Sequence, residues 1–241
     1  KLVKLRERIR SLEKNNPNLE FFDAALLNLF KHWFNPSFLV LKEIDWATPA
    51  SILEKIIAYE AVHEINSWSE LRSRLEPEDR RCFAFFHPLI ANEPLIFVEV
   101  AFTNNMPRKI DEVIKIDRSI MSVEDISTAV FYSISSCQDG LSGISFGNFL
   151  IKEVVYKLKR KNEALKKFVT LSPAPDFTKW LKEQSIDEDL DEESLMKQAM
   201  TYLLYSNRED GFPNDPVARF HLGNGATLER INLNADMSLK G

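Results

Sequence analysis

This sequence of 241 residues contains few cysteines and histidines, and each shortage excludes a kind of site. Its two cysteines, Cys82 and Cys137, cannot form a framework of several disulfides, so we expect a reducing compartment. The four histidines and two cysteines show no metal-ligand spacing, so no metal site is predicted. No apolar run reaches membrane-spanning length, and membrane insertion is not expected.

Basic residues are fewer than acidic ones, 31 Lys and Arg against 36 Asp and Glu. The formal net charge is -5, which argues against a general nucleic-acid binder. An anionic ligand would therefore need a local basic patch or the N-terminus of a helix. The first residue, Lys1, is not a start methionine, so we expect a fragment from which targeting signals could be lost.

The first part of the chain is predicted to be helical. Over residues 1–35, the sequence Asn-Asn-Pro-Asn at 15–18 separates two helices, and four residues of the second form one apolar stripe: Phe22, Leu26, Leu29 and Trp33. A strand is predicted next at 37–46. A helix is then predicted to begin with Thr48 as its N-cap and Pro49 as its first residue. A further short helix is predicted at 68–75.

The remaining residues alternate between strand and helix patterns, which is typical of the α+β class. Strands are predicted at 81–88, 93–102, 128–136 and 168–175. Helices are predicted at 146–161, after Asp176 as a cap, and at 193–206, with an acidic connector at 186–193. A hairpin is predicted at 217–233, with Asn224-Gly225 as its turn.

Glycine is scarce as well, yet three of the seven glycines lie in one loop between a strand and a helix: Gly140, Gly143 and Gly147. Such a loop lets a phosphate approach backbone N–H groups and the helix N-terminus. Neither the P-loop nor the dinucleotide-binding motif is present. From the residues alone, a tight packing turn is the alternative.

Longer motifs resemble one family. The segments "DWATPASILEKIIAYEAVHEI", "RRCFAFFHPLIANEPLIFVEVA", "YSISSCQDGLSGISFGNFLIK", "LSPAPDFTKWL" and "NDPVARFHLGNGATLERIN" look like malonyl-CoA decarboxylase, in the same order and over nearly the whole chain. The resemblance implies a mixed sheet of the GCN5-related acetyltransferase fold with flanking helices over 36–241, incomplete at its C-terminus, preceded by the end of a helical domain at 1–35.

The resemblance also implies site residues. Ser172 and His221 match a catalytic serine–histidine pair, although the residues alone favour an ordinary strand-end serine and a structural histidine in a hairpin strand. The loop would hold the phosphates of coenzyme A, although Leu141 stands where the usual first glycine of such loops should be. Its implied contact residues are Gln138, Gly140, Leu141, Ser142, Gly143, Ile144, Gly147 and Asn148.

The sequence departs from the family at two places. Ser145 stands where some members have glutamate, and we expect Asn148 to supply a polar contact in its place. A tyrosine that completes the family's site lies beyond Gly241. The other histidines, His32, His63 and His87, are interpreted as packing, structural and turn residues.

The implied function is decarboxylation of malonyl-CoA to acetyl-CoA and CO2, a lyase reaction that needs no cofactor, because the thioester is itself the electron sink. His221 would be the proton donor or orienting base, and Ser172 would contact the carboxylate or enolate oxygen. Alternatives are an acyltransferase on the same fold and a non-catalytic acyl-CoA sensor. The resemblance further implies a homo-oligomer, in a bacterial cytoplasm or in mitochondria, peroxisomes or cytosol.

Overall fold

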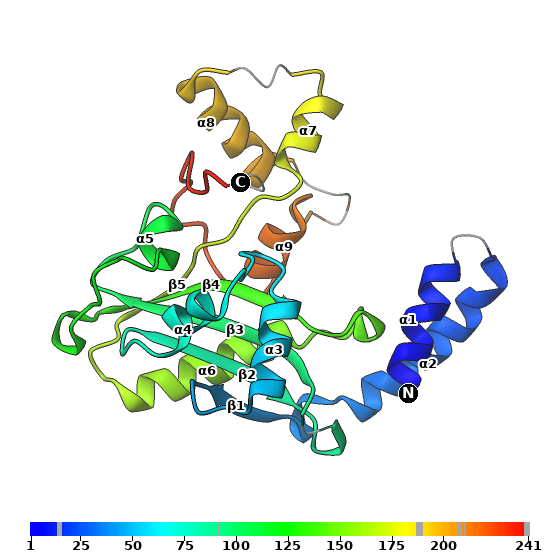
Figure 1. Ribbon diagram of the computed structural model, residues 1–241. Helices are drawn as coiled ribbons and strands as arrows, with labels where there is room; N and C mark the ends of the chain where they lie inside the picture. The colour runs from blue at the N-terminus through cyan, green and yellow to red at the C-terminus, as the bar shows by residue number, and fades with distance from the viewer. Residues whose placement is uncertain (14–15, 91, 187–189, 207–208, 210, 239–241) are drawn as a thin grey trace. The chain divides into compact units, whose positions relative to one another are not determined.

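A five-stranded sheet lies at the centre of one of the two compact units into which the chain divides (Figure 1). The computed structural model describes every residue except 14–15, 91, 187–189, 207–208, 210 and 239–241. The first unit comprises 1–106 and 114–170, and the second comprises 107–113 and 171–241. The sheet and helices confirm the α+β class. The predicted domain boundary near residue 35 stays a prediction.

The strands follow one another across the sheet in sequence order. The first four pair antiparallel, and the fifth joins parallel to the fourth, with helix α6 (Gly147–Lys161) between them in sequence. A parallel neighbour needs such a crossover connection. The bounds are β1 Val40–Ile44, β2 Arg80–Phe86, β3 Pro94–Thr103, β4 Thr128–Ser136 and β5 Lys167–Thr170.

Alternate residues of the strands fill two hydrophobic cores, because successive side chains of a strand point to opposite faces. On β2, Phe83 and Phe85 belong to the same core as Leu150 and Val154 of α6. Cys82, Ala84 and Phe86 belong to the other core, with residues of α3 (Ala50–Tyr59) and α4 (Trp68–Leu75). The central strands were therefore predictable from their long apolar runs.

The pairing between β4 and β5 ends five residues before β4 does. Their pairing runs from Thr128 opposite Lys167 to Phe131 opposite Thr170, whereas β4 continues to Ser136. The last five residues of β4 therefore extend past the end of β5, and the chain then enters the glycine-containing loop.

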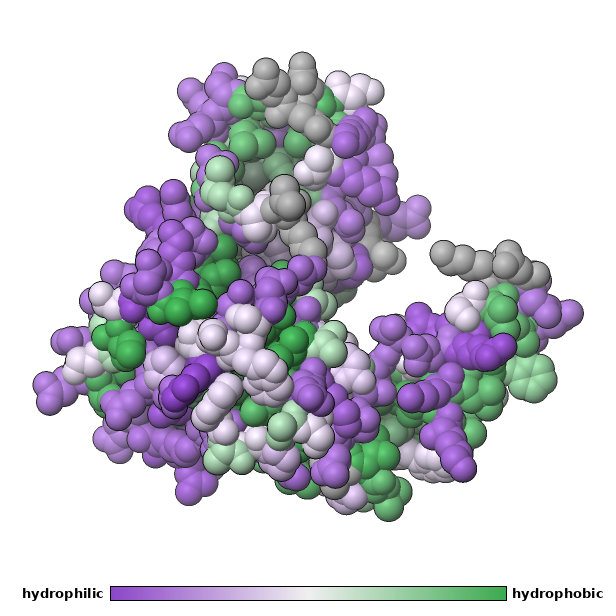
Figure 2. Space-filling view, in the orientation of Figure 1, coloured by the Kyte–Doolittle hydropathy of each residue, from purple (hydrophilic) through white to green (hydrophobic). Residues whose placement is uncertain are grey.

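Two N-terminal helices, α1 (Leu2–Glu13) and α2 (Glu20–Trp33), confirm the helical prediction for this region. The predicted apolar stripe is not a buried face, because Phe22 and Trp33 are 56% and 48% exposed, while Phe30 is fully buried. Figure 2 shows hydrophobic residues at the surface of this helical pair. The spacing thus identified the helix, and of the four stripe residues Leu26 packs partly buried against the hydrophobic core.

The other helices are short. They are α5 Asp111–Ile114, α7 Phe177–Glu183, α8 Glu192–Met200, a π-helix Thr201–Tyr205, α9 Pro216–Gly223, and the 3-10 turns Pro17–Leu19, Pro36–Phe38, Pro88–Ile90, Val123–Asp125 and Asp139–Leu141. Within the acidic connector, 187–189 lie outside the described residues, and Asp191 caps α8 by accepting the N–H of Ser194.

Of two predicted helix caps, Thr48 is wrong and Asp176 is confirmed in position but not in its hydrogen bond. The hydroxyl of Thr48 accepts the N–H of Asp45 in a local turn, and Pro49 occupies the N-cap position before α3. Asp176 stands at the N-cap of α7, but its side chain makes no capping hydrogen bond. For Thr48 the residue type suited the position, but its hydroxyl bonds within the preceding turn.

Candidate active site

Ser172 and His221 lie together in the second unit. The Ser172 Oγ is 3.1 Å from the His221 Nε2, which is hydrogen-bonding distance. Ser172 is in the segment Leu-Ser-Pro-Ala-Pro, two residues beyond the end of β5, and the two prolines restrict the backbone after it. The pair is therefore formed by residues 49 positions apart in sequence.

His221 lies on helix α9, so the predicted hairpin at 217–233 is wrong. Asp215 caps this helix, since its Oδ1 accepts the N–H groups of Val217 and Ala218 at 2.9 and 2.8 Å. Pro216 occupies the first helical position, where its missing N–H costs nothing. The sequence Asp-Pro is thus a helix start, a signal that the sequence analysis passed over.

The dipeptide Asn224-Gly225, interpreted above as a hairpin turn, ends helix α9 instead. Gly225 has φ of +88°, and its N–H donates to Leu222 O, while the N–H of Ala226 donates to His221 O. This is the Schellman arrangement, in which a glycine with positive φ closes a helix. The same residue pair serves both structures because both require a left-handed residue.

The electrostatic state of His221 follows from its partial burial, which lowers the pKa of its imidazole below the ordinary value of 6.5. The ring is therefore neutral at neutral pH. A neutral imidazole can accept a hydrogen bond from the Ser172 hydroxyl at Nε2, or donate one in its other tautomer. Phe220 packs edge-on against the ring, with centroids 5.0 Å apart.

The glycine-containing loop belongs to the first unit. Its N–H groups at Leu141, Ser142 and Ile144 donate to carbonyls within the loop, to Gln138, Asp139 and Leu141 in turn. Leu141 is buried and Ile144 packs against the hydrophobic core. Leu141 and Ile144 therefore shape the loop, and their side chains pack in the interior rather than toward a ligand.

Each of the three glycines in this loop has its own surroundings. A Cβ on Gly140 would lie 2.1 Å from the Val3 carbonyl oxygen, so this glycine permits contact with α1. Gly143 has φ of +88° and is exposed. Gly147 is buried and begins α6. The packing-turn interpretation thus holds for Gly140, while Gly143 and the start of α6 keep features expected of an anion site.

Among the residues that the structure describes, no side chain caps the first turn of α6. Its N-cap residue is Phe146, which has no side-chain acceptor to cap the helix. The first N–H groups of a helix lack partners inside the helix and carry the positive end of its dipole. Ser145 and Ser142 are exposed beside this turn, and Asn148 is half-buried within it. An oxyanion is the ligand that such a helix start favours.

The remaining candidates lie elsewhere. His87 bonds through Nε2 to Trp33 O and accepts the N–H of Leu89, as expected of a turn residue. Within the part of the chain that the structure describes, no three His, Cys, Asp or Glu side chains gather as around a metal ion. The same residues include no helix long and apolar enough to cross a membrane.

A cluster of buried charge was missed by the sequence analysis. Glu99 of β3 is fully buried and pairs with Arg74 of α4 at 3.0 Å, and burial raises the pKa of Glu99 to about 7. Glu60 accepts the hydroxyl of Ser133 at 2.7 Å. One signal was available: Glu99 is the only charged residue in the otherwise apolar run Leu-Ile-Phe-Val-Glu-Val-Ala-Phe.

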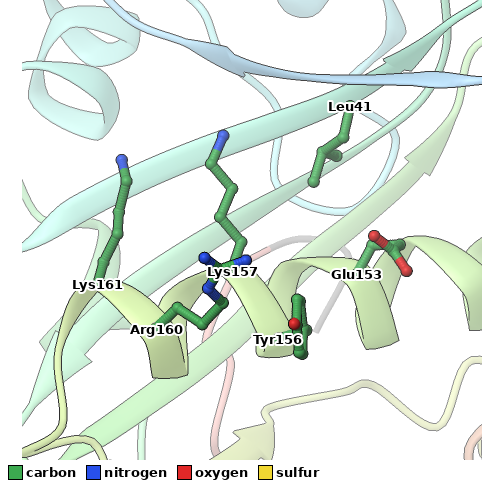
Figure 3. Close-up of a pocket in the computed structure, with 6 residues that line it drawn as sticks. All are labelled: Leu41, Glu153, Tyr156, Lys157, Arg160 and Lys161. Atoms are coloured by element: carbon green, nitrogen blue, oxygen red, sulfur yellow. The ribbon is translucent and has the colours of Figure 1, made fainter.

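An open surface pocket on the C-terminal half of α6 is a different feature (Figure 3). Its cations are already engaged: Lys157 and Lys161 point toward Glu43, with Nζ to carboxylate distances of 3.8 and 2.8 Å. Arg160 lies over the ring of Tyr156. The pocket is lined by Leu41, Glu153, Tyr156, Lys157, Arg160 and Lys161, none of them a predicted site residue.

Comparisons with known proteins agree on one family. The family profile described as malonyl-CoA decarboxylase C-terminal domain matches residues 37–192 and 183–241. The mitochondrial malonyl-CoA decarboxylase of Anser anser anser is 34% identical over 291 residues, which cover 100% of this chain and 58% of that protein. This chain therefore spans little more than half the length of that relative.

Solved structures give the same result. The crystal structure of malonyl-CoA decarboxylase from Rhodopseudomonas palustris has a TM-score of 0.90 and 47% identity, covering 100% of this chain and 65% of that one. The loading GNATL domain of CurA from Lyngbya majuscula has a TM-score of 0.54 at 13% identity, over 81% of this chain. The second likeness shows the acetyltransferase-like fold alone.

Proposed function

This chain belongs to the malonyl-CoA decarboxylase family, and from that premise we propose that it decarboxylates malonyl-CoA to acetyl-CoA and CO2. The observation that carries the proposal is the 3.1 Å contact between Ser172 Oγ and His221 Nε2. A hydroxyl paired with a neutral imidazole suits a reaction that must handle one proton and one developing negative charge.

The reaction breaks the bond between the carboxylate carbon and the α-carbon of the malonyl group. The electron pair moves to the thioester as an enolate, CO2 leaves, and the α-carbon then takes a proton. Ser172 is proposed to donate a hydrogen bond to the carboxylate or to the enolate oxygen, where charge develops. His221 is proposed to orient this hydroxyl with its neutral ring. The α-carbon takes its proton from the ring N–H or, through the pair, from the Ser172 hydroxyl, and a proton from water then restores the pair.

The nucleotide end of the substrate is assigned to the loop and α6. Gly143, with its exposed backbone, and the uncapped start of α6 at Gly147 and Asn148 offer N–H donors to a diphosphate. Gln138 and Ser142 are proposed to contribute polar contacts at the edge. Gly140, Leu141 and Ile144 are proposed to act through the shape of the loop.

The proposed chemistry requires no metal or organic cofactor, because the thioester carbonyl accepts the electron pair. The alternative of Ser172 as a covalent nucleophile is not part of the proposal. A homo-oligomer, and a location in the bacterial cytoplasm or in a eukaryotic mitochondrion, peroxisome or cytosol, remain predictions from the family. The curated relative is a mitochondrial protein.

The test is product analysis of the whole protein incubated with malonyl-CoA and no acyl acceptor. CO2 and acetyl-CoA are expected in equal amounts. Ser172→Ala and His221→Asn should each lower kcat by roughly 100-fold or more, the usual contribution of a positioned acid or base. His32→Asn is the matched control, because His32 is an exposed helix residue bonded to Asn28 O.

Two outcomes would contradict the proposal. Binding of malonyl-CoA without release of CO2 would favour the acyltransferase or the sensor. Full activity in both Ser172→Ala and His221→Asn would show that the decarboxylation uses other residues.

A further inference from the structure

Arg6 of α1 is a buried arginine tied to the proposed coenzyme A loop. Its side chain is 2% exposed and forms a two-point ion pair with Asp23 of α2, with Nε to Oδ1 at 2.8 Å and Nη2 to Oδ2 at 3.0 Å. An arginine is rarely buried unless its charge is paired and its donors are used. The third nitrogen of this guanidinium, Nη1, is not used by Asp23, so its partners indicate the role of the buried pair.

That donor, Nη1, contacts two carbonyls of the loop. It lies 2.9 Å from Gly140 O and 2.7 Å from Ser142 O. The approach depends on Gly140, because a Cβ there would collide with the Val3 carbonyl of the same helix α1. Arg10, one turn further along α1, donates to Asp139 O at 2.9 Å. Helix α1 thus fixes three carbonyls of one short loop.

Fixing a carbonyl also fixes the next N–H, because the peptide group is planar and its C=O and N–H point in opposite directions in the trans form. The described residues contain no cis peptide bond. When Arg6 holds Ser142 O, the N–H of Gly143 must point away from the guanidinium. No acceptor among the described residues takes this N–H, and Gly143 itself is exposed.

We propose that Arg6 is a positioning residue for coenzyme A: it holds the 142–143 peptide so that the Gly143 N–H donates to a diphosphate oxygen. This inference rests on the proposed function, since it needs the loop to bind the nucleotide. Arg6 does not touch the ligand. Its own charge is offset by Asp23, so its contribution comes from orientation of the backbone and not from attraction of the phosphates.

The experiment compares malonyl-CoA with malonyl-pantetheine, a thioester that lacks the nucleotide diphosphate. In the whole protein, Arg6→Lys keeps a positive charge opposite Asp23 but has no planar fork to reach Asp23 and both carbonyls together. We expect its KM for malonyl-CoA and its dissociation constant for coenzyme A to rise roughly tenfold, the effect of one hydrogen bond to a charged group. Its kcat and its kinetics with malonyl-pantetheine should match those of the wild type.

Two further variants control the result. Arg8→Gln removes an exposed arginine of the same helix and should change none of these constants. Arg6→Gln leaves Asp23 without its partner and risks misfolding; if it folds, its defect with malonyl-CoA should exceed that of Arg6→Lys.

Unchanged coenzyme A affinity in Arg6→Lys would overturn the inference. An equal loss with malonyl-CoA and malonyl-pantetheine would also overturn it, because Arg6 would then serve the fold in general. A wild-type protein that neither binds coenzyme A nor releases CO2 would instead overturn the proposed function.

Discussion

At the scale of single residues, the chemistry depends on the protonation state of one imidazole. Burial lowers the pKa of His221, so its neutral form dominates at neutral pH. The neutral ring keeps a lone pair at one nitrogen and a proton at the other. It can therefore orient the Ser172 hydroxyl without first losing a proton.

The pH profile tests this state. If the neutral imidazole is the active form, kcat/KM should rise with pH through a pKa below 6.5 and then stay level to about pH 8. The measurement is initial rates of CO2 release between pH 5 and 8, at constant ionic strength. A rate that falls as the pH rises through 6 to 7 would mean that the imidazolium is the active form.

Residue identities were predicted to different degrees. Ser172 and His221 were named from motifs that resemble a family, and the structure brings the two side chains within 3.1 Å. Their catalytic roles stay a prediction. Arg6 was not singled out, because nothing near it in the sequence indicates a loop more than 130 residues away. Only the folded chain places a buried guanidinium against those carbonyls.

At the scale of elements, helix α9 sets the position of His221. Asp215 is fully buried, caps the helix with Oδ1, and accepts the hydroxyl of Tyr202 with Oδ2 at 3.0 Å. One carboxylate thus joins the start of α9 to the π-helical segment before it. The imidazole lies six residues after this anchor, so a shift at Asp215 would be carried along the helix to the ring.

Removing this anchor should affect both stability and rate. Asp215→Ala removes the cap and leaves the Tyr202 hydroxyl without its acceptor, at a cost of about 2 kcal/mol or more. The kcat of the folded protein should fall as well. Urea unfolding and rates per folded molecule measure the two effects.

Helix α8 provides the matched control. Asp191→Ala removes a similar cap from a helix that carries no proposed site residue. It should leave kcat unchanged. Equal kcat in the two variants would show that the cap of α9 does not position His221.

At the scale of the whole molecule, a buried ion pair in the first unit joins helix α4 to the sheet. Arg74 projects from α4 to Glu99 in the sheet, and it also donates to the carbonyls of His63 and Glu64. The two charged side chains are 5% and 0% exposed. Such a pair contributes little net stability while intact, but losing one partner leaves an uncompensated buried charge.

Arg74→Met should therefore destabilise the fold strongly, by roughly 3–5 kcal/mol at pH 8. Without Arg74, the pKa of Glu99 must rise further, because the guanidinium opposes the effect of burial. The folded variant then binds a proton more readily than its unfolded chain, so the loss of stability should shrink as the pH falls from 8 to 5. Urea unfolding at both pH values measures it.

The exposed pair on the same helix is the control. Glu76→Gln breaks the ion pair with Arg72 at the surface and should leave the unfolding midpoint nearly unchanged. A midpoint for Arg74→Met that is equally unchanged, at either pH, would contradict the role given to the buried pair.

The sequence by itself determined the order of the elements in the sheet unit, because long apolar strands and one amphipathic helix carry strong local patterns. Its motifs also identified the family and named Ser172 and His221 as candidate catalytic residues. Only the tertiary structure decided that Asn224-Gly225 ends a helix, and that Phe22, Leu29 and Trp33 of the stripe on α2 are exposed. It also decided that Gly140 lies against α1. The physical reason is that a residue's local preferences allow several structures, while burial and long-range hydrogen bonds select one of them.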